Sequence, residues 1–459
     1  MPSTPRTDLP SGPVGDLVVV LPGIMGSVLA RDGREVWNHT LAVAGRLALS
    51  RLDEVERLVL PPGTGDADPG DGVRPVGLMN GLHVLPGVFA IDGYGTLLTF
   101  LERRLGLSER AGNLLTFPYD WRLSVRLTAR RLAARVEPAL ADWRARSGNP
   151  GARAVFVAHS MGGLVARYYL DVLGGGAHAR SLVTIGTPYR GSVNALVSLH
   201  AGVAPGLGRL SAPFTRLARS MPSLHQLLPS WRCLADRDGT RSDVVRTQVS
   251  GVDGALSADA GRLHEELDHA DGDGYALHVF GGCRQPTRQS ALLTSGQLGA
   301  RRDLDGTDHL GDGTVPRFSC FPAQWTDDST VRFFAQKHGA LQNERALLNQ
   351  LEALLTARDP RRFLDGRLEL CVDVPEVAEG AECPVEVTAD DDRLALSVTA
   401  EHVETGRADR GRTLRNRGDG RYGTRLTLPA PGAWRVTVTD TRNAGRVHPV
   451  SSVVLAPER

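Results

Sequence analysis

The sequence has very little lysine, almost no net charge and no long apolar runs. Lys337 is the only lysine among 53 basic residues, and 52 acidic residues leave a net charge of +1 over 459 residues. So balanced a charge provides no general attraction for nucleic acid or for an acidic membrane, and we expect no nucleic-acid partner. No stretch reaches the roughly 18 consecutive apolar residues that indicate a transmembrane segment. Peripheral contact with a lipid surface would therefore have to be apolar.

Cysteine is also scarce, and the five cysteines lack the CxxC spacing of a zinc site. Cys371 and Cys383 could pair across neighbouring strands, but free thiols are expected in the absence of an export signal. Residues 1–16 form a polar tail without the apolar run of a signal peptide, so we expect a cytoplasmic protein. The aspartates around His309 lack the spaced ligands and closing glutamate of a calcium loop. We therefore expect no metal and no other cofactor.

What is present divides the chain into two regions of different character. In residues 17–358, short apolar runs such as Leu17–Leu21 alternate with helical patterns such as Gly95–Leu105, which predicts a mainly parallel sheet covered on both faces. Residues 362–459 contain short β-rich runs separated by turns, which is typical of an immunoglobulin-like β-sandwich. The first region is long enough to include a cap insertion at about 192–270.

The strongest signal for chemistry is a serine between a predicted strand and a predicted helix. The run Val155–Gly163 leads a β-branched strand into Ser160, and a helical pattern follows at once. This is the nucleophile elbow G-x-S-x-G, with Ala158 in place of the first glycine. Such a turn lifts the serine oxygen above the sheet and directs the Met161 amide at a developing oxyanion. An ordinary strand-to-helix turn with a chance serine is the alternative interpretation.

In such a fold an acid and then a histidine follow the serine along the chain. Asp312, in the glycine-bracketed loop Leu310–Pro316, is the best-placed acid, with a solvated Asp-Gly turn as the alternative. Three other aspartates compete with it: Asp303, Asp305 and Asp308. His338 follows the run predicted to be the last strand of the sheet. His159 is next to Ser160 in the chain, so its side chain should point away from the serine oxygen.

A second oxyanion donor should come from the loop after an early strand. The run Leu21–Ser27 fits this position, with the Ile24 amide as the donor and a plain Pro-Gly turn as the alternative. Together these residues predict acyl transfer through a serine ester. His338 would take the serine proton, Asp312 would orient the imidazole, and two amides would hold the tetrahedral oxyanion.

Five motifs resemble, in chain order, those of the lecithin:cholesterol acyltransferase-like lipases. They are Leu21–Ser27, Phe117–Arg122, Ala158–Gly163, Gly311–Pro316 and His338. The second is the most family-specific, and the resemblance covers residues from about 17 to 355. It implies an α/β-hydrolase fold, and it does not extend to the β-rich tail.

The resemblance also implies the roles of individual residues. Ser160, Asp312 and His338 would form the triad, and the oxyanion amides would be those of Ile24 and Met161. Two further residues are candidates for substrate binding: Trp121 in the second motif and Tyr189 in the lipase-like run Thr184–Ser192.

The predicted cap is rich in large apolar side chains between residues 195 and 231. These side chains would either favour a lipid acyl chain in the site or simply pack onto the body of the domain. The leading expectation is a serine lipase or O-acyltransferase acting on lipid esters, with water or an alcohol as acyl acceptor. A general carboxylesterase or amidase is one alternative, and an inert hydrolase scaffold used for binding is another.

Overall fold

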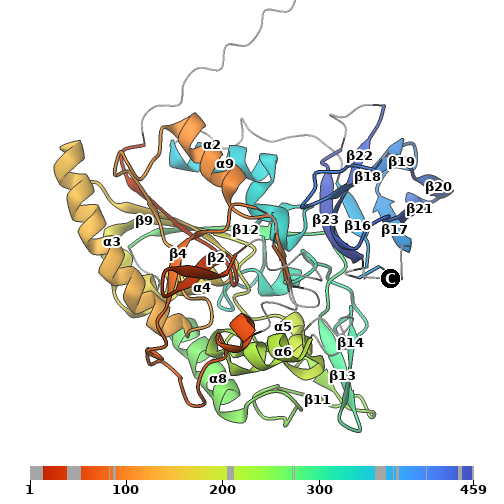
Figure 1. Ribbon diagram of the computed structural model, residues 1–459, viewed down its shortest axis with the longest axis horizontal. Coiled ribbons are helices and arrows are strands. Elements are labelled where there is room, and N and C mark those ends of the chain that lie inside the picture. The colour runs from red at the N-terminus through yellow and green to blue at the C-terminus, as the bar shows by residue number, and fades with distance from the viewer. Residues whose placement is uncertain are drawn as a thin grey trace, which may run out of the picture.

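The computed structural model describes most of the chain in two bodies packed side by side, a large α/β body and a smaller β body (Figure 1). The described residues are 14–38, 53–81, 83–85, 89–203, 211–270, 272, 274–356, 369–375, 377–378, 382–409, 411–442 and 447–456. Most of the predicted N-terminal tail and the predicted linker between the two domains lie outside these ranges.

Six strands form the central sheet of the large body, and all neighbouring strands in it are parallel. Their order is β15 (Arg332–Phe334), β12 (Ala276–Gly282), β9 (Ala179–Ile185), β8 (Ala154–His159), β1 (Leu17–Leu21) and β7 (Leu114–Thr116). All five side chains of β1 are buried, because helices cover both faces of the sheet. The predicted strand at Leu17–Leu21 is confirmed with the same bounds.

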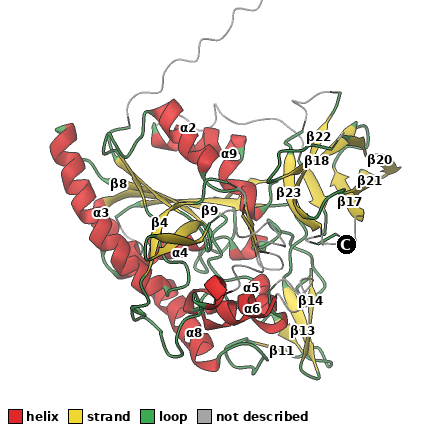
Figure 2. Ribbon diagram, in the orientation of Figure 1, coloured by secondary structure: helices red, strands yellow, loops and turns green. Residues whose placement is uncertain are grey.

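Four helices pack against this sheet: α2 (Gly95–Leu105), α3 (Val125–Ser147), α4 (Met161–Arg167) and α9 (Arg345–Leu355). Consecutive residues of β1 point to opposite faces, so Val18 and Val19 belong to different hydrophobic clusters. Val18 lies in a cluster with leucines of α2 and α9, and Val19 in one with residues of α3 and α4. Figure 2 shows these two pairs of helices on opposite sides of the sheet. This is the predicted α/β-hydrolase fold.

Smaller elements surround this frame. One antiparallel sheet contains β3 (Arg34–Trp37), β2 (Ser27–Arg31) and β4 (Val73–Leu78), and a hairpin contains β5 (His83–Leu85) and β6 (Phe89–Ile91). Another sheet has the order β11 (Arg241–Ser242), β10 (Leu234–Ala235), β13 (Ser290–Thr294) and β14 (Gln297–Arg301). Short non-α helices are η2 (Tyr168–Val172), η3 (Gly175–His178), η5 (Arg317–Ser319) and η6 (His338–Asn343).

In its described residues, the segment predicted as a cap contains four α-helices: α5 (Val193–Ala201), α6 (Ser211–Ser220), α7 (Pro222–His225) and α8 (Gly254–His269). Leu196, Leu217 and Leu224 are buried in the same hydrophobic cluster as Phe156 of β8. These side chains therefore pack onto the body of the domain. Leu207 and Leu210, also counted among the apolar side chains of the cap, lie outside the described residues.

The smaller body is a β-sandwich of two antiparallel sheets. One has the order β16 (Leu370–Asp373), β17 (Glu382–Ala389), β21 (Arg421–Thr427) and β20 (Arg415–Gly418). The other has the order β19 (Arg412–Thr413), β18 (Leu396–His402), β22 (Gly432–Asp440) and β23 (Val450–Ala456). Buried side chains alternate with more accessible ones along β17 and β23, so one face of each sheet forms the shared core around Trp434.

All five cysteines lie in described residues and are free thiols. Cys371 and Cys383 lie on the paired strands β16 and β17, but Cys371 faces Thr388 and Cys383 faces Leu426. The open question of a bond between them is thereby settled for this structure, and the expectation of free thiols is confirmed. None of the helices in the described part combines the length and apolarity needed to cross a bilayer.

Candidate active site

Ser160 occupies the sharp turn between β8 and α4. Its backbone has φ 53° and ψ −127°, a strained combination for a residue other than glycine. The turn is possible because its neighbours are small: a Cβ on Gly162 would overlap the carbonyl oxygen of Pro22. The Ser160 amide donates to the carbonyl of Ile185 at 2.8 Å, so the adjacent strand β9 holds the turn in place. This is the predicted geometry of a nucleophile elbow.

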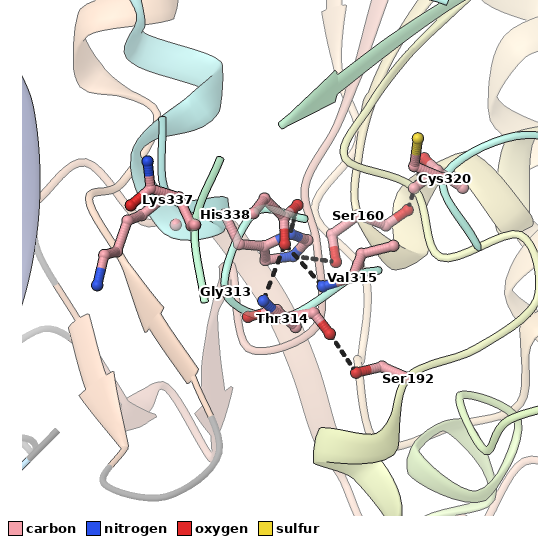
Figure 3. Close-up of polar contacts among 12 residues, drawn as sticks. Ser160, Ser192, Gly313, Thr314, Val315, Cys320, Lys337 and His338 are labelled. Carbon is pink, nitrogen blue, oxygen red and sulfur yellow. Dashed lines mark hydrogen bonds and ion pairs between the residues drawn. The ribbon is translucent and has the colours of Figure 1, made fainter. Parts of the chain in front are cut away.

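The three residues predicted to form a triad are linked by two consecutive hydrogen bonds. His338 Nε2 is 2.9 Å from Ser160 Oγ, and His338 Nδ1 is 2.7 Å from Asp312 Oδ2. Because a carboxylate only accepts, Nδ1 carries the proton, and Nε2 accepts from the serine hydroxyl. The side chains of His338 and Ser160 point toward each other, whereas the neighbouring Lys337 side chain points away (Figure 3). All three groups are buried, with at most 4% of each residue exposed.

Asp312 is oriented by its own loop. Its Oδ1 accepts the amides of Thr314 at 2.9 Å and Val315 at 2.6 Å, which leaves Oδ2 for the imidazole. The carbonyl of Asp312 also accepts the amide of His338 at 2.8 Å. Two contacts, one from the side chain and one from the backbone, therefore tie the acid to the histidine.

The competing aspartates bind other groups. Asp308 Oδ1 accepts from the Gln289 amide group, Asp305 pairs with Arg241, and Asp303 accepts the amide of Gly306. None of them contacts His338 among the described residues. The described part also contains no group of three or more His, Cys, Asp or Glu side chains arranged to hold a metal ion.

The loop after β1 lies directly on the candidate nucleophile. A Cβ on Gly23 would come within 2.8 Å of Ser160 Cβ, so only glycine fits there without movement. The loop turns through a hydrogen bond from the Gly26 amide to the Gly23 carbonyl at 3.0 Å, with Met25 at φ 61°. No described residue accepts a hydrogen bond from the Ile24 amide. Its role as an oxyanion donor, with the Met161 amide at the start of α4, stays a prediction.

Trp121 and Tyr189, the predicted substrate-binding residues, both have their polar atoms bonded inside the protein. The Trp121 indole N–H donates to the Ser27 carbonyl at 3.2 Å, and the Tyr189 hydroxyl is 3.0 Å from Thr184 Oγ1. Both side chains are essentially fully buried. Their contact with substrate therefore stays a prediction.

His159 does not contact the serine oxygen, in keeping with the sequence-based expectation. Its Nδ1 is 2.9 Å from the Tyr94 hydroxyl, and its Nε2 is 3.1 Å from the backbone carbonyl of His338. Burial, followed by the proximity of His338, lowers the pKa of His159 to about 3. A neutral imidazole therefore lies 5.1 Å, centroid to centroid, from that of His338.

Two buried glutamines connect the loops of Asp312 and His338 to the β-sandwich. Gln285 Nε2 donates to the Leu370 carbonyl at 3.0 Å, and its Oε1 accepts the Val372 amide at 3.2 Å. The backbone amide of Gln285 donates to the carbonyl of Gly311, the residue before Asp312. Gln285 thus connects the sandwich to the acid loop.

Gln336 makes the equivalent contact for the histidine loop. Its Nε2 donates to the Pro449 carbonyl at 3.3 Å, and its Oε1 accepts the amides of Lys337 at 2.9 Å and Ser451 at 3.4 Å. Sequence analysis did not identify either glutamine. A lone polar residue whose sandwich partners are 85 to 115 positions away leaves no periodic or motif signal.

Comparison with known proteins gives one family. Residues 51–271 match the family described as lecithin:cholesterol acyltransferase. The matched segment includes the Phe117–Arg122 motif and Ser160, and it ends before Asp312 and His338. Comparison with curated proteins finds no match.

Several solved structures are similar to the chain at low sequence identity. The lipase BlEst2 of Bacillus licheniformis in its propeptide form has a TM-score of 0.37 and 11% identity, covering 97% of this chain and 95% of that one. In its mature form the TM-score is 0.34 at 11% identity, with 76% and 95% covered. The phospholipase PlaB of Legionella pneumophila has a TM-score of 0.34 and 13% identity, with 95% and 90% covered.

Proposed function

The segment 51–271 belongs to the lecithin:cholesterol acyltransferase family, and from this premise we propose that the chain is a serine hydrolase or O-acyltransferase acting on lipid esters. The proposed reaction passes through an acyl-enzyme on Ser160. The observation that carries it is the hydrogen-bonded sequence Ser160–His338–Asp312, with distances of 2.9 and 2.7 Å. Family membership supports the class of reaction, and this geometry supports the mechanism.

In the proposed mechanism the Ser160 hydroxyl gives its proton to His338 Nε2 as its oxygen attacks the ester carbonyl. The ionised Asp312 carboxylate accepts from Nδ1 and stabilises the imidazolium that forms. The amides of Ile24 and Met161 bind the tetrahedral oxyanion. His338 then protonates the leaving alcohol, and the Ser160 ester remains. Water or an alcohol attacks this ester, with His338 again as the base.

A lipid substrate is part of the proposal because of the family match. The net charge of +1 offers no electrostatic route to a lipid surface. Recognition of a lipid would then depend on apolar contact, which grows with the length of the acyl chain. A general esterase or amidase would show no such dependence.

Labelling by a fluorophosphonate probe tests the mechanism most directly. Wild type should be labelled, and Ser160→Ala should not, with turnover of esters reduced by several orders of magnitude. Asp312→Asn and His338→Ala should react at least about 1,000-fold more slowly than wild type. Ser257→Ala is a matched control, because Ser257 is also buried and its hydroxyl has no partner among the described residues. Absence of labelling in folded wild type would instead support an inert scaffold.

A series of p-nitrophenyl esters of rising chain length tests the substrate class. We expect kcat/KM for these esters to rise with the length of the acyl chain. We also expect high activity toward phospholipids presented in vesicles. A maximum at acetate or butyrate, with no activity on vesicles, would overturn the lipid part of the proposal while leaving the serine chemistry intact.

A further inference from the structure

A single peptide group next to Ser160 is held on both of its polar atoms by buried tyrosines. The amide of Gly23 donates to the Tyr94 hydroxyl oxygen at 2.7 Å. The carbonyl of Pro22, in the same peptide group, accepts from the Tyr119 hydroxyl at 2.8 Å. Both tyrosines are at most 2% exposed, so water does not replace these bonds readily. Rotation of this peptide would break both bonds together.

The peptide lies where its orientation affects the direction of the predicted oxyanion donor. It directly precedes Ile24, whose amide is the predicted donor, and a Cβ on Gly23 would lie only 2.8 Å from Ser160 Cβ. The direction of the Ile24 N–H depends on the backbone rotations that start at this peptide. Catalytic donors lose most of their effect when they are misplaced by about 1 Å.

Tyr94 also extends the connection to the histidine side of the site. His159 Nε2 faces the His338 carbonyl, which only accepts, so Nε2 carries the proton of the neutral ring. His159 Nδ1 is then an acceptor, and the hydroxyl it faces, that of Tyr94, is the donor. Each hydrogen bond from Gly23 through Tyr94 and His159 to His338 therefore has one defined direction.

Tyr119 is itself held firmly by the loop that it contacts. Its amide donates to Ser27 Oγ at 3.0 Å, and the Trp121 indole donates to the Ser27 carbonyl at 3.2 Å. The next residue, Arg122, forms a buried ion pair with Asp120 at 2.6 Å. The Phe117–Arg122 motif thus packs as one unit against both ends of the loop after β1. Burial raises the pKa of Tyr119 well above its usual value, so its hydroxyl keeps the proton that it donates.

We propose that Tyr94 and Tyr119 are positioning residues, whose hydroxyl groups clamp the Pro22–Gly23 peptide so that the Ile24 amide faces the oxyanion formed at Ser160. This proposal rests on the proposed function, because it concerns the same site. It assigns a role to the tyrosine of the family-specific motif. It also identifies a second tyrosine, Tyr94, that belongs to none of the motifs.

Tyr94→Phe and Tyr119→Phe test the clamp, because each keeps the ring and removes only the hydroxyl. Activity is measured per active site titrated with a fluorophosphonate, so that any unfolded fraction is not counted. We expect kcat to fall about 10- to 100-fold in Tyr94→Phe and about 10-fold in Tyr119→Phe, with KM within about twofold. The inhibition constant of a trifluoromethyl ketone, which forms a tetrahedral oxyanion on serine, should rise in parallel with the loss of kcat.

Tyr422→Phe is the matched control in the sandwich. The Tyr422 hydroxyl also accepts a backbone amide, that of Leu394 at 3.1 Å, and donates to the carbonyl of Asp391 at 2.8 Å. It should lower stability but leave kcat per active site unchanged. A decrease in kcat of similar size in all three variants would mean a general loss of packing and would overturn the clamp.

The remaining outcomes separate the clamp from the proposed function. Unchanged kcat and unchanged ketone inhibition in both Tyr94→Phe and Tyr119→Phe, with normal labelling, would refute the clamp alone. Absence of labelling in wild type would refute the proposed function first. If one variant does not fold, the other still decides, because each removes one of the two bonds to the same peptide.

Discussion

The two sides of the candidate active site are supported by different parts of the molecule. On one side, the loop after β1 is held by Tyr94 and Tyr119, which belong to the same α/β domain. On the other, the loops of Asp312 and His338 are held by Gln285 and Gln336 against backbone groups of the β-sandwich. The sandwich is therefore not merely attached to the hydrolase domain. It supports the acid and the histidine, while the hydrolase core supports the loop over the serine.

The strongest test of this comparison is to remove the two glutamine contacts. Gln285→Ala removes hydrogen bonds from buried backbone groups of the sandwich, at a cost of about 1–3 kcal/mol, and Gln336→Ala removes bonds from partly buried ones. We expect kcat per active site to fall about 10-fold or more, since the loops of Asp312 and His338 would shift. Steady-state kinetics and thermal unfolding measure both effects.

A buried glutamine far from the sandwich provides the control. Gln226 accepts the Val125 amide at 2.8 Å and donates to Asp259 at 3.0 Å, both within the hydrolase domain. Gln226→Ala should destabilise the protein to a similar degree without the same loss of kcat. Equal kcat losses in all three glutamine variants would contradict a specific role for the sandwich.

The second prediction concerns His159, which joins the two sides. Its pKa is lowered to about 3 from 6.5, chiefly by burial, so between these values the unfolded chain binds a proton that the folded chain does not. Its contribution to stability is therefore complete above pH 6.5 and is lost as the pH falls toward 3. One such group contributes a slope of at most about 1.4 kcal/mol per pH unit.

Urea unfolding at a series of pH values measures this slope in wild type and in His159→Asn. We expect the variant to lose less stability on acidification, because it has no group to protonate at this position. Parallel curves for the two proteins between pH 6.5 and 4 would show that His159 is not held in the neutral state.

The smallest effect is expected at the rim of the contact between the domains. Arg302 pairs with Asp373 of the sandwich at 2.8 Å, but both side chains are at least 40% exposed. Exposed ion pairs of this kind contribute about 0–1 kcal/mol to the free energy of unfolding, and this contribution decreases as the salt concentration rises. Arg302→Ala should therefore change the free energy of unfolding by less than about 1 kcal/mol and leave kcat unchanged. A large loss of kcat would mean that this surface ion pair, rather than the buried glutamines, keeps the two domains in the orientation that the active site needs.

Prediction from sequence succeeded where burial leaves a continuous pattern. The strand Leu17–Leu21 and the helix Gly95–Leu105 have the predicted bounds, because both faces of the strand and one stripe of the helix are apolar. Strands β19 and β20 of the sandwich were missed, since every one of their side chains is exposed. An edge strand of arginine, threonine and asparagine has no apolar alternation to reveal it.

The candidate site divides in the same way. Ser160 was identified by the small residues of its turn, and Asp312 and His338 by their order along the chain; all three lie in hydrogen-bonded sequence. Tyr94 was not identified, because a single tyrosine before a helix is a common feature. Its proposed role depends on its contacts with Gly23, 71 positions earlier in the chain, and with His159, 65 positions later.

The sequence alone was enough to predict the class of fold, a resemblance to one family and a set of candidate residues for acyl chemistry. These depend on local patterns, namely strand burial, the small residues around Ser160 and the order of serine, acid and histidine. Tertiary structure alone decided how the loops around these residues are held. Hydrogen bonds from single buried side chains to distant backbone groups have no period and no motif, so they become visible only when folding brings their partners together.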